Sequence, residues 1–188
     1  MTTQALHHPS RPLHRVLSRR LVVAAELLFT AGVSIGWVRY EHRSTTPLHH
    51  VPGSNAWWQH AAIAAVALAI AAMIWFGQRS GRIGRHVLLA PLSRSAAERI
   101  GLLYHRALWR PAAFARALAA TPLLLVMMFF LFRGGFQVTS GIDPNATINA
   151  WGGPTYIGAM ACHYLDGLLI MAAAAWLLNL LLPDRNSA

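Results

Sequence analysis

The sequence predicts an all-α integral membrane protein, a four-transmembrane-helix bundle with a cytoplasmic amphipathic surface helix. Of its 188 residues, 55% are hydrophobic and only 12% are charged, whereas soluble domains average about 25% charged residues. A soluble fold with so few charges could not cover its own surface. The apolar residues also concentrate in four long blocks, which is the pattern that membrane-spanning segments produce.

The four blocks are long enough to cross a membrane as helices. The predicted spans are residues 21–38, 57–76, 112–132 and 156–182. A helix rises about 1.5 Å per residue and a hydrocarbon core is about 30 Å thick, so about 20 residues suffice. The blocks do not alternate as barrel strands do, and backbone groups in lipid must be satisfied within the segment. We expect one transmembrane domain, 21–183, with a basic tail at 1–20 and a short tail at 184–188.

The positions of the arginines predict the orientation. All sixteen basic residues are Arg, and seven of them lie in the segment 79–110, whereas 134–155 contains none. The positive-inside rule therefore places both tails and the segment 79–110 in the cytoplasm, with 39–56 and 134–155 outside. Trp and Tyr residues fall near both predicted interfaces, as aromatic belts do. We expect a multi-pass protein of the cell (inner) membrane.

The net charge of +10 can indicate nucleic acid, anionic lipid or membrane topology. Because the arginines lie beside apolar spans, topology is the preferred explanation, and a bilayer with anionic headgroups is the expected partner. No aromatic-basic platform accompanies the charge, so nucleic acid is not an expected partner. Cys162 is the only cysteine, which excludes an intrachain disulfide and a Cys-based zinc site. The chain has no HExxH motif, phosphate-binding glycine loop or Ser-His-Asp arrangement, which counts against hydrolases and kinases of the soluble type.

The first span has a second interpretation. Ser18–Leu21 loosely resembles a twin-arginine export signal, and residues 34–36 could serve as a small-residue cleavage site. Glu26 interrupts the apolar region, which favours an uncleaved span. The other three spans would keep the same orientation in either case.

A basic amphipathic helix is predicted at about 96–110, on the inner membrane surface. Ser95 and Glu98 form a capping-box pattern before it, and apolar side chains recur along it at helical spacing. It either anchors the topology through headgroup contacts or docks a partner or regulatory lipid. The candidate lipid- or partner-binding residues are Arg99, Arg106 and Arg110.

Four glycines are candidates for helix packing. Gly32 and Gly36 form a GxxxG pair in the first span, which lets two helix backbones approach closely. Packing within the chain is preferred over homodimerisation. Gly158 and Gly167 belong to the fourth span.

The fourth span carries the main polar stripe. Gly158, Cys162 and Asp166 lie four residues apart, and His163 lies in the adjacent row of the same helix face. A carboxylate at membrane depth is costly and needs a partner, and His163 is close enough to Asp166 to share a proton. The stripe is either a proton-handling or polar substrate site, or a structural pair that holds the helices together.

Glu26 is the second acid at membrane depth. It lies within two turns of Arg19 and Arg20 and could meet Arg116 of the third span. A structural ion pair near the inner interface explains it. Alternatively, Glu26 and Asp166 line one cavity and mark the two halves of an ion path.

Two histidines are weak candidates for haem ligands. His60 and His163 lie on different spans, as the axial ligands of four-helix cytochromes do. Their estimated depths differ by more than a helical turn, which makes a shared haem awkward. No cofactor and no metal site are therefore expected.

Three hypotheses for function remain. The first is a noncatalytic accessory or assembly subunit that binds partner membrane subunits. The second is a small proton-coupled transporter that uses Asp166 and His163. The third is an intramembrane haem or redox protein. The first is preferred because it demands least of individual residues, and no catalytic residue is identified.

Overall fold

The computed structural model describes residues 16–84 and 87–183, and every regular element in these ranges is helical apart from one antiparallel bridge between Leu17 and Ser93. The elements are α2 (Arg19–Glu41), α3 (Trp57–Arg79), the 3₁₀ helix η1 (Val87–Leu92), α4 (Arg94–Ala107), α5 (Pro111–Ser140), α6 (Pro144–Thr147) and α7 (Tyr156–Leu181). Four of them, α2, α3, α5 and α7, are long and apolar enough to cross a membrane. The predicted all-helical fold with four candidate spans is therefore confirmed.

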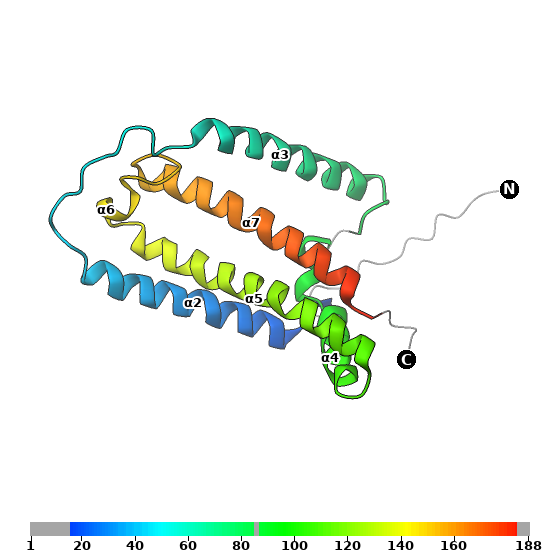
Figure 1. Cartoon of the computed structure of the whole chain (residues 1–188). Coiled ribbons are helices and arrows are strands. Elements are labelled where there is room, and N and C mark those ends of the chain that lie inside the picture. The colour runs from blue at the N-terminus through cyan, green and yellow to red at the C-terminus, as the bar shows by residue number, and fades with distance from the viewer. Residues whose placement is uncertain (1–15, 85–86, 184–188) are drawn as a thin grey trace.

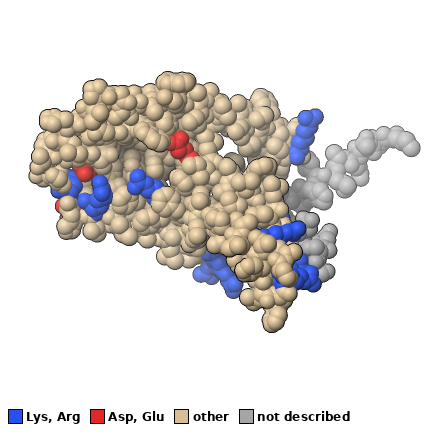
Figure 2. Space-filling model, viewed as in Figure 1, with Lys and Arg blue, Asp and Glu red and all other residues tan. Residues whose placement is uncertain are grey.

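Helices α5 and α7 lie at the centre of the molecule, and the other long helices pack against them. Helix α2 lies along α5 over its whole length, and α7 follows on the other side of α5 (Figure 1). Basic side chains gather mainly toward the two ends of the molecule (Figure 2). The face between these ends shows few charged side chains (Figure 2), and many large apolar side chains of the long helices are exposed.

A small core joins α4 to the ends of α5 and α7. Leu103 of α4 is 2% exposed and packs with Ala117 and Ala120 of α5 and with Leu178 and Leu182 at the end of α7. The apolar stripe of α4 is thus used within the molecule. Ile100 and Ala107 of α4 are half-buried against this core, whereas Leu108, just beyond the end of α4, is 73% exposed.

Helix α3 is the least packed of the four long helices. Only 6% of the apolar segment of α3 is buried, compared with 11–17% for the apolar segments of the other three long helices. It contacts α7 only sparsely and diverges from it away from the end near α6 (Figure 1). The helix is nevertheless continuous, because its many alanines favour helix without needing tertiary contacts.

Several helix boundaries differ from the predicted ranges, and the differences in α5 and α4 have a visible structural cause. The third span continues to Ser140 instead of ending at residue 132, because Gly134 and Gly135 pack against neighbouring helices instead of opening a loop. Helix α4 begins at Arg94, and its cap is Ser93, whose Oγ accepts a hydrogen bond from the backbone N–H of Ala96 at 3.1 Å. The predicted tails at 1–20 and 184–188 lie mostly or wholly outside the described residues.

Candidate functional site

An ionisable pair joins α3 to α7 near the end of the bundle that carries α6. His60 Nε2 lies 3.1 Å from Asp166 Oδ2, and the two side chains are 7% and 27% exposed. His60 is in the first turn of α3, whereas Asp166 is ten residues into α7. The second ring nitrogen, Nδ1, lies 2.9 Å from the carbonyl oxygen of Ala56.

The hydrogen bonds fix how many protons the pair holds. The carbonyl of Ala56 can only accept, so His60 Nδ1 must carry a proton and donate it. Between Nε2 and Oδ2 there is then one further proton, which resides either on the imidazolium or on the carboxyl group. The pair is neutral overall in both cases, and this neutrality makes it tolerable in a medium of low dielectric.

Trp151 lies beside the pair on the side of the loops. The ring of Trp151 lies 5.9 Å from the ring of His60, measured between centroids. The backbone N–H of Ala56 donates to the carbonyl of Trp151 at 2.8 Å. A Cβ on Gly158 would collide with the Gly152 carbonyl and approach Trp57. The loop before α7 therefore fits closely over the start of α3, which limits solvent access from this side.

The loop that joins α2 to α3 is fastened to the segment around α6. Asn145 accepts from the N–H of Leu48 at 2.9 Å and donates to the carbonyls of Ser44 and Thr46. Asn149 accepts from the N–H of Val51 at 2.8 Å. These side chains explain why this predicted outer segment, rich in Asn and Gly, adopts a defined shape.

The structure gives Asp166 a different hydrogen-bonding partner from the one that the sequence suggested. The sequence favoured His163, three residues away on the same helix, but Asp166 reaches across to His60 on α3. His163 is only half-buried, and the adjacent Tyr164 donates to the carbonyl of Gly134 on α5 at 2.9 Å. Cys162 is 5% exposed and carries a free thiol.

Glu26 stands apart from this site. Its side chain is exposed on α2, and in the described part of the chain no ion pair joins it to Arg116. Helix α5 lies between α2 and α7 (Figure 1). The structure therefore does not bring Glu26 to Asp166, as a shared ion path would require.

The predicted packing glycines lie at helix contacts. A Cβ on Gly32 would collide with the backbone of Phe132 on α5, and one on Gly36 with the backbone of Phe136. The GxxxG pair of α2 thus faces α5 of the same chain. Gly167 of α7 faces Phe130 of α5, where a Cβ would lie 3.1 Å from the ring.

Arg99, one of the three candidate lipid-binding arginines, is used inside the molecule. Its guanidinium donates to the side-chain oxygen of Asn179 at 2.6 Å and to the carbonyls of Asn179, Leu182 and Pro183 at 2.9–3.2 Å. These carbonyls belong to the end of α7, where helices leave acceptors unsatisfied. Arg99 therefore caps α7, whereas Arg106 and Arg110 line a pocket.

The geometry does not favour the haem interpretation. Both ring nitrogens of His60 are hydrogen bonded, so the side chain offers no free nitrogen to an iron. Within residues 16–84 and 87–183, no three His, Cys, Asp or Glu side chains are grouped so that they could hold a metal ion.

The pairing of His60 with Asp166 was missed because the sequence does not give the stagger between helices. His60 lies about 5 Å and Asp166 about 15 Å along their helices from the loop end, at about 1.5 Å per residue. The two meet because α7 begins farther out than α3. The four loop residues between Trp151 and α7 place the start of α7 beyond the contact of Trp151 with Ala56, but no local sequence pattern identifies that contact.

Comparison of the chain with models of known protein families, with characterised proteins and with solved structures finds no significant match.

Proposed function

We propose that this chain is a noncatalytic accessory or assembly subunit of a membrane complex, and that a transmembrane helix of a partner protein packs between α3 and α7. The observation that carries the proposal is the apolar space that these helices leave open beyond the His60–Asp166 pair. We further propose that the protein is a multi-pass protein of the cell membrane with the α4 end in the cytoplasm.

Two rows of apolar residues border this space. On α3, Ala64, Ala67 and Ala71 follow His60 at spacings of four, three and four residues, so they share its helix face. Ala64 and Ala67 are half-buried and Ala71 is exposed. This face points toward α7, yet it is not covered by it.

The facing row of α7 follows the same spacing. Ile170, Ala173 and Leu177 come four, seven and eleven residues after Asp166 and share its face. Ile170 and Leu177 are each 42% exposed, and Ala173 is exposed as well. The molecule is visibly hollowed between α3 and α7 (Figure 2).

A helix fits this space better than lipid chains do. Association of helices in lipid depends on close backbone approach, and small residues permit it. The row on α3 consists of alanines only, and α7 contributes Ala173. Two large apolar side chains, Ile170 and Leu177, are partly exposed there and can pack against an inserted helix. Contacts with the partner helix would supply the packing that α3 lacks within this chain.

Site-specific photo-crosslinking in the native membrane tests the proposal. A photoreactive amino acid is placed at Ala71, which lies on the face of His60, or at Met73, which is 63% exposed on the opposite face at nearly the same depth. We expect a discrete protein adduct from position 71, identified by mass spectrometry, and none from position 73.

The outcomes separate a partner from the bilayer. Adducts of lipid alone from position 71 would refute the partner helix. Equal protein adducts from both positions would mean random collision, which also contradicts the proposal. An adduct with a second copy of this chain would assign the space to homo-oligomerisation and would remove the accessory role.

A second candidate function rests on the His60–Asp166 pair. A proton shared between two groups at membrane depth, with His163 half-buried one turn away, is an arrangement that proton-coupled transporters use. The test is pH-dependent proton flux in liposomes, comparing wild type with Asp166→Asn and His163→Ala. Loss of flux in variants that stay folded would favour this function, and absence of flux in the wild type would exclude it.

A further inference from the structure

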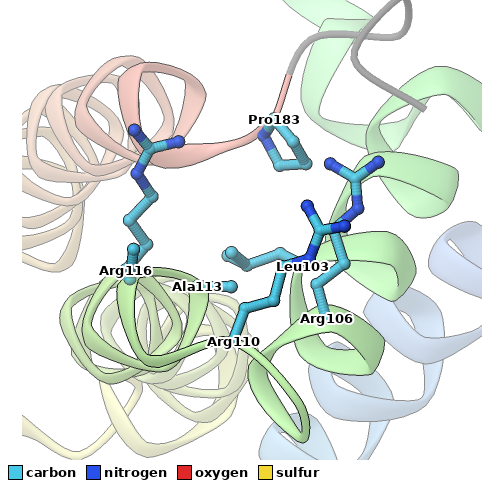
Figure 3. Close-up of a pocket in the computed structure, with 7 residues that line it drawn as sticks. Leu103, Arg106, Arg110, Ala113, Arg116 and Pro183 are labelled. Carbon is cyan, nitrogen blue, oxygen red and sulfur yellow. The ribbon is translucent and has the colours of Figure 1, made fainter.

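A pocket lies at the α4 end of the bundle, on the side away from the His60–Asp166 pair. It is formed by α4, the first turns of α5 and the residues that follow α7, and it has a volume of about 180 Å³. Arg106, Arg110 and Arg116 surround it, with Leu103, Ala113 and Pro183 (Figure 3). A single water needs only about 10–15 Å³ on such a scale, so the pocket has room for a polyatomic group.

The charge of this pocket is entirely positive. Its lining includes three arginines and no acid. They come from different elements: Arg106 from α4, Arg110 from the residue before α5, and Arg116 from the second turn of α5. Like charges gathered around one space repel one another, and this repulsion is relieved when an anion enters.

The start of α5 adds donors to the same place. Helix α5 begins at Pro111, and its N-cap residue, Arg110, makes no side-chain cap hydrogen bond. The first backbone N–H groups of a helix have no partner within it, and here they include those of Ala112 and Ala113, which line the pocket. These donors and the positive end of the helix dipole favour an anion at this position.

Two of the three guanidinium groups are not used to hold the fold. Arg110 and Arg116 are exposed, and in the described part of the chain neither makes a hydrogen bond or ion pair. Arg99, seven residues before Arg106 on α4, shows the contrast, because its guanidinium donates to the carbonyls at the end of α7. Arg110 and Arg116 therefore keep planar donor groups for a ligand.

We propose that this pocket binds a phosphate group with Arg106, Arg110, Arg116 and the first backbone amides of α5. A guanidinium presents paired N–H donors that match two phosphate oxygens. A phosphate monoester suits the site, because it carries up to two negative charges and three free oxygens. The phosphate can come from the headgroup of an anionic lipid or from a soluble phosphate compound.

Calorimetric titration of the purified full-length chain in detergent tests the proposal. The probes are short-chain phosphatidic acid, inorganic phosphate, and short-chain phosphatidylcholine, whose phosphate is masked by choline. We expect saturable binding of at least one of the first two probes and none of phosphatidylcholine. Binding of phosphatidic acid alone assigns the site to a lipid headgroup, and binding of inorganic phosphate assigns it to a soluble ligand.

Two variants and one control make the test specific. Arg110→Gln with Arg116→Gln removes two exposed charges from the pocket, and Arg19→Gln with Arg20→Gln removes two exposed charges from the start of α2. We expect the first pair to weaken binding at least tenfold and the second to change it less than twofold. Ala113→Leu fills the pocket without altering charge, and it should also weaken binding severalfold.

Three results would overturn the proposal. Binding by the wild type that never saturates would indicate diffuse attraction. Equal losses in the two double variants would show that net charge alone attracts the probe. Unchanged binding in Ala113→Leu, in a protein with wild-type thermal unfolding, would place the anion outside the pocket.

Discussion

The His60–Asp166 pair combines a hydrogen bond with a constraint on helix position. His60 Nδ1 is held by its own helix through the Ala56 carbonyl, so the ring has a fixed orientation before it meets Asp166. The bond from Nε2 to Oδ2 then sets where α3 lies along α7. Because α3 has few other contacts with the bundle, we expect this single pair to contribute much of the interaction free energy that holds α3 in position.

A double-mutant cycle measures that share. We expect His60→Ala and Asp166→Ala to show a coupling energy of about 1–2 kcal/mol in the free energy of unfolding, because hydrogen bonds between membrane helices reach about 1.7 kcal/mol. The same cycle between His163→Ala and Asp166→Ala should give less than about 0.5 kcal/mol. Unfolding in mixed detergent micelles gives both values, and equal coupling in the two cycles would contradict the assignment of His60 as the partner.

At the scale of single residues, chemistry was easier to predict than geometry. The cost of a carboxylate in lipid identifies Asp166 as a residue that needs a partner, whatever the fold. The choice between His60 and His163 depends on the offset of two helices along the membrane normal. That offset is set by loop hydrogen bonds such as the one from Ala56 to Trp151, which no local pattern encodes.

At the scale of elements, the contact between α2 and α5 is the most extensive one among the described helices. Backbone meets backbone at three glycines: Gly32 and Gly36 of α2 and Gly135 of α5. Thr139 adds a hydrogen bond from its hydroxyl to the carbonyl of Val33 at 2.8 Å. Such packing relies on dispersion and weak polar contacts, which need short distances.

Adding one methyl group at this contact should separate the helices. For Gly135→Ala, the new Cβ would collide with the carbonyl of Phe29, and for Gly32→Ala with that of Phe132. We expect each to lower the free energy of unfolding by about 1–3 kcal/mol, as overpacking does. The control is Gly101→Ala in α4, where a Cβ meets nothing within 4 Å. It should be neutral or stabilising by up to about 1 kcal/mol, and a loss there similar to that at Gly135 would contradict the packing argument.

The sequence predicted one half of this contact. The spacing of Gly32 and Gly36 indicates a close approach, but it does not identify the partner helix. The matching surface of α5 contains Gly134 and Gly135 after Arg133, and this combination of charge and glycines is typical of a loop. Tertiary packing keeps the segment helical to Ser140, because Gly134 and Gly135 both pack against residues of neighbouring helices.

At the scale of the whole molecule, the number and type of helices were predictable because lipid imposes them. A span must be apolar, about 20 residues long and helical, so the four blocks correspond to α2, α3, α5 and α7. The arrangement of these helices was not predictable in the same way. Both the packed and the exposed sides of these helices carry apolar side chains, so hydropathy does not show that α5 is central and α3 peripheral.

The orientation of the molecule in the membrane is the remaining large-scale prediction. The positive-inside rule places the loop between α2 and α3 outside and α4 in the cytoplasm. Cys162 is first replaced by Ala, because its position is buried and accepts a small residue. A single cysteine is then introduced on each predicted side of the membrane, and its reaction with a thiol reagent shows on which side it lies. We expect Thr45→Cys to react with a membrane-impermeant maleimide in right-side-out vesicles, and His105→Cys to react only after the membrane is permeabilised. Both residues are exposed in the structure, so a cysteine that fails to react is shielded by the membrane and not by burial within the protein. The reverse pattern would invert the molecule, and it would place the proposed phosphate pocket on the outer surface, away from the cytoplasmic lipids and phosphate compounds.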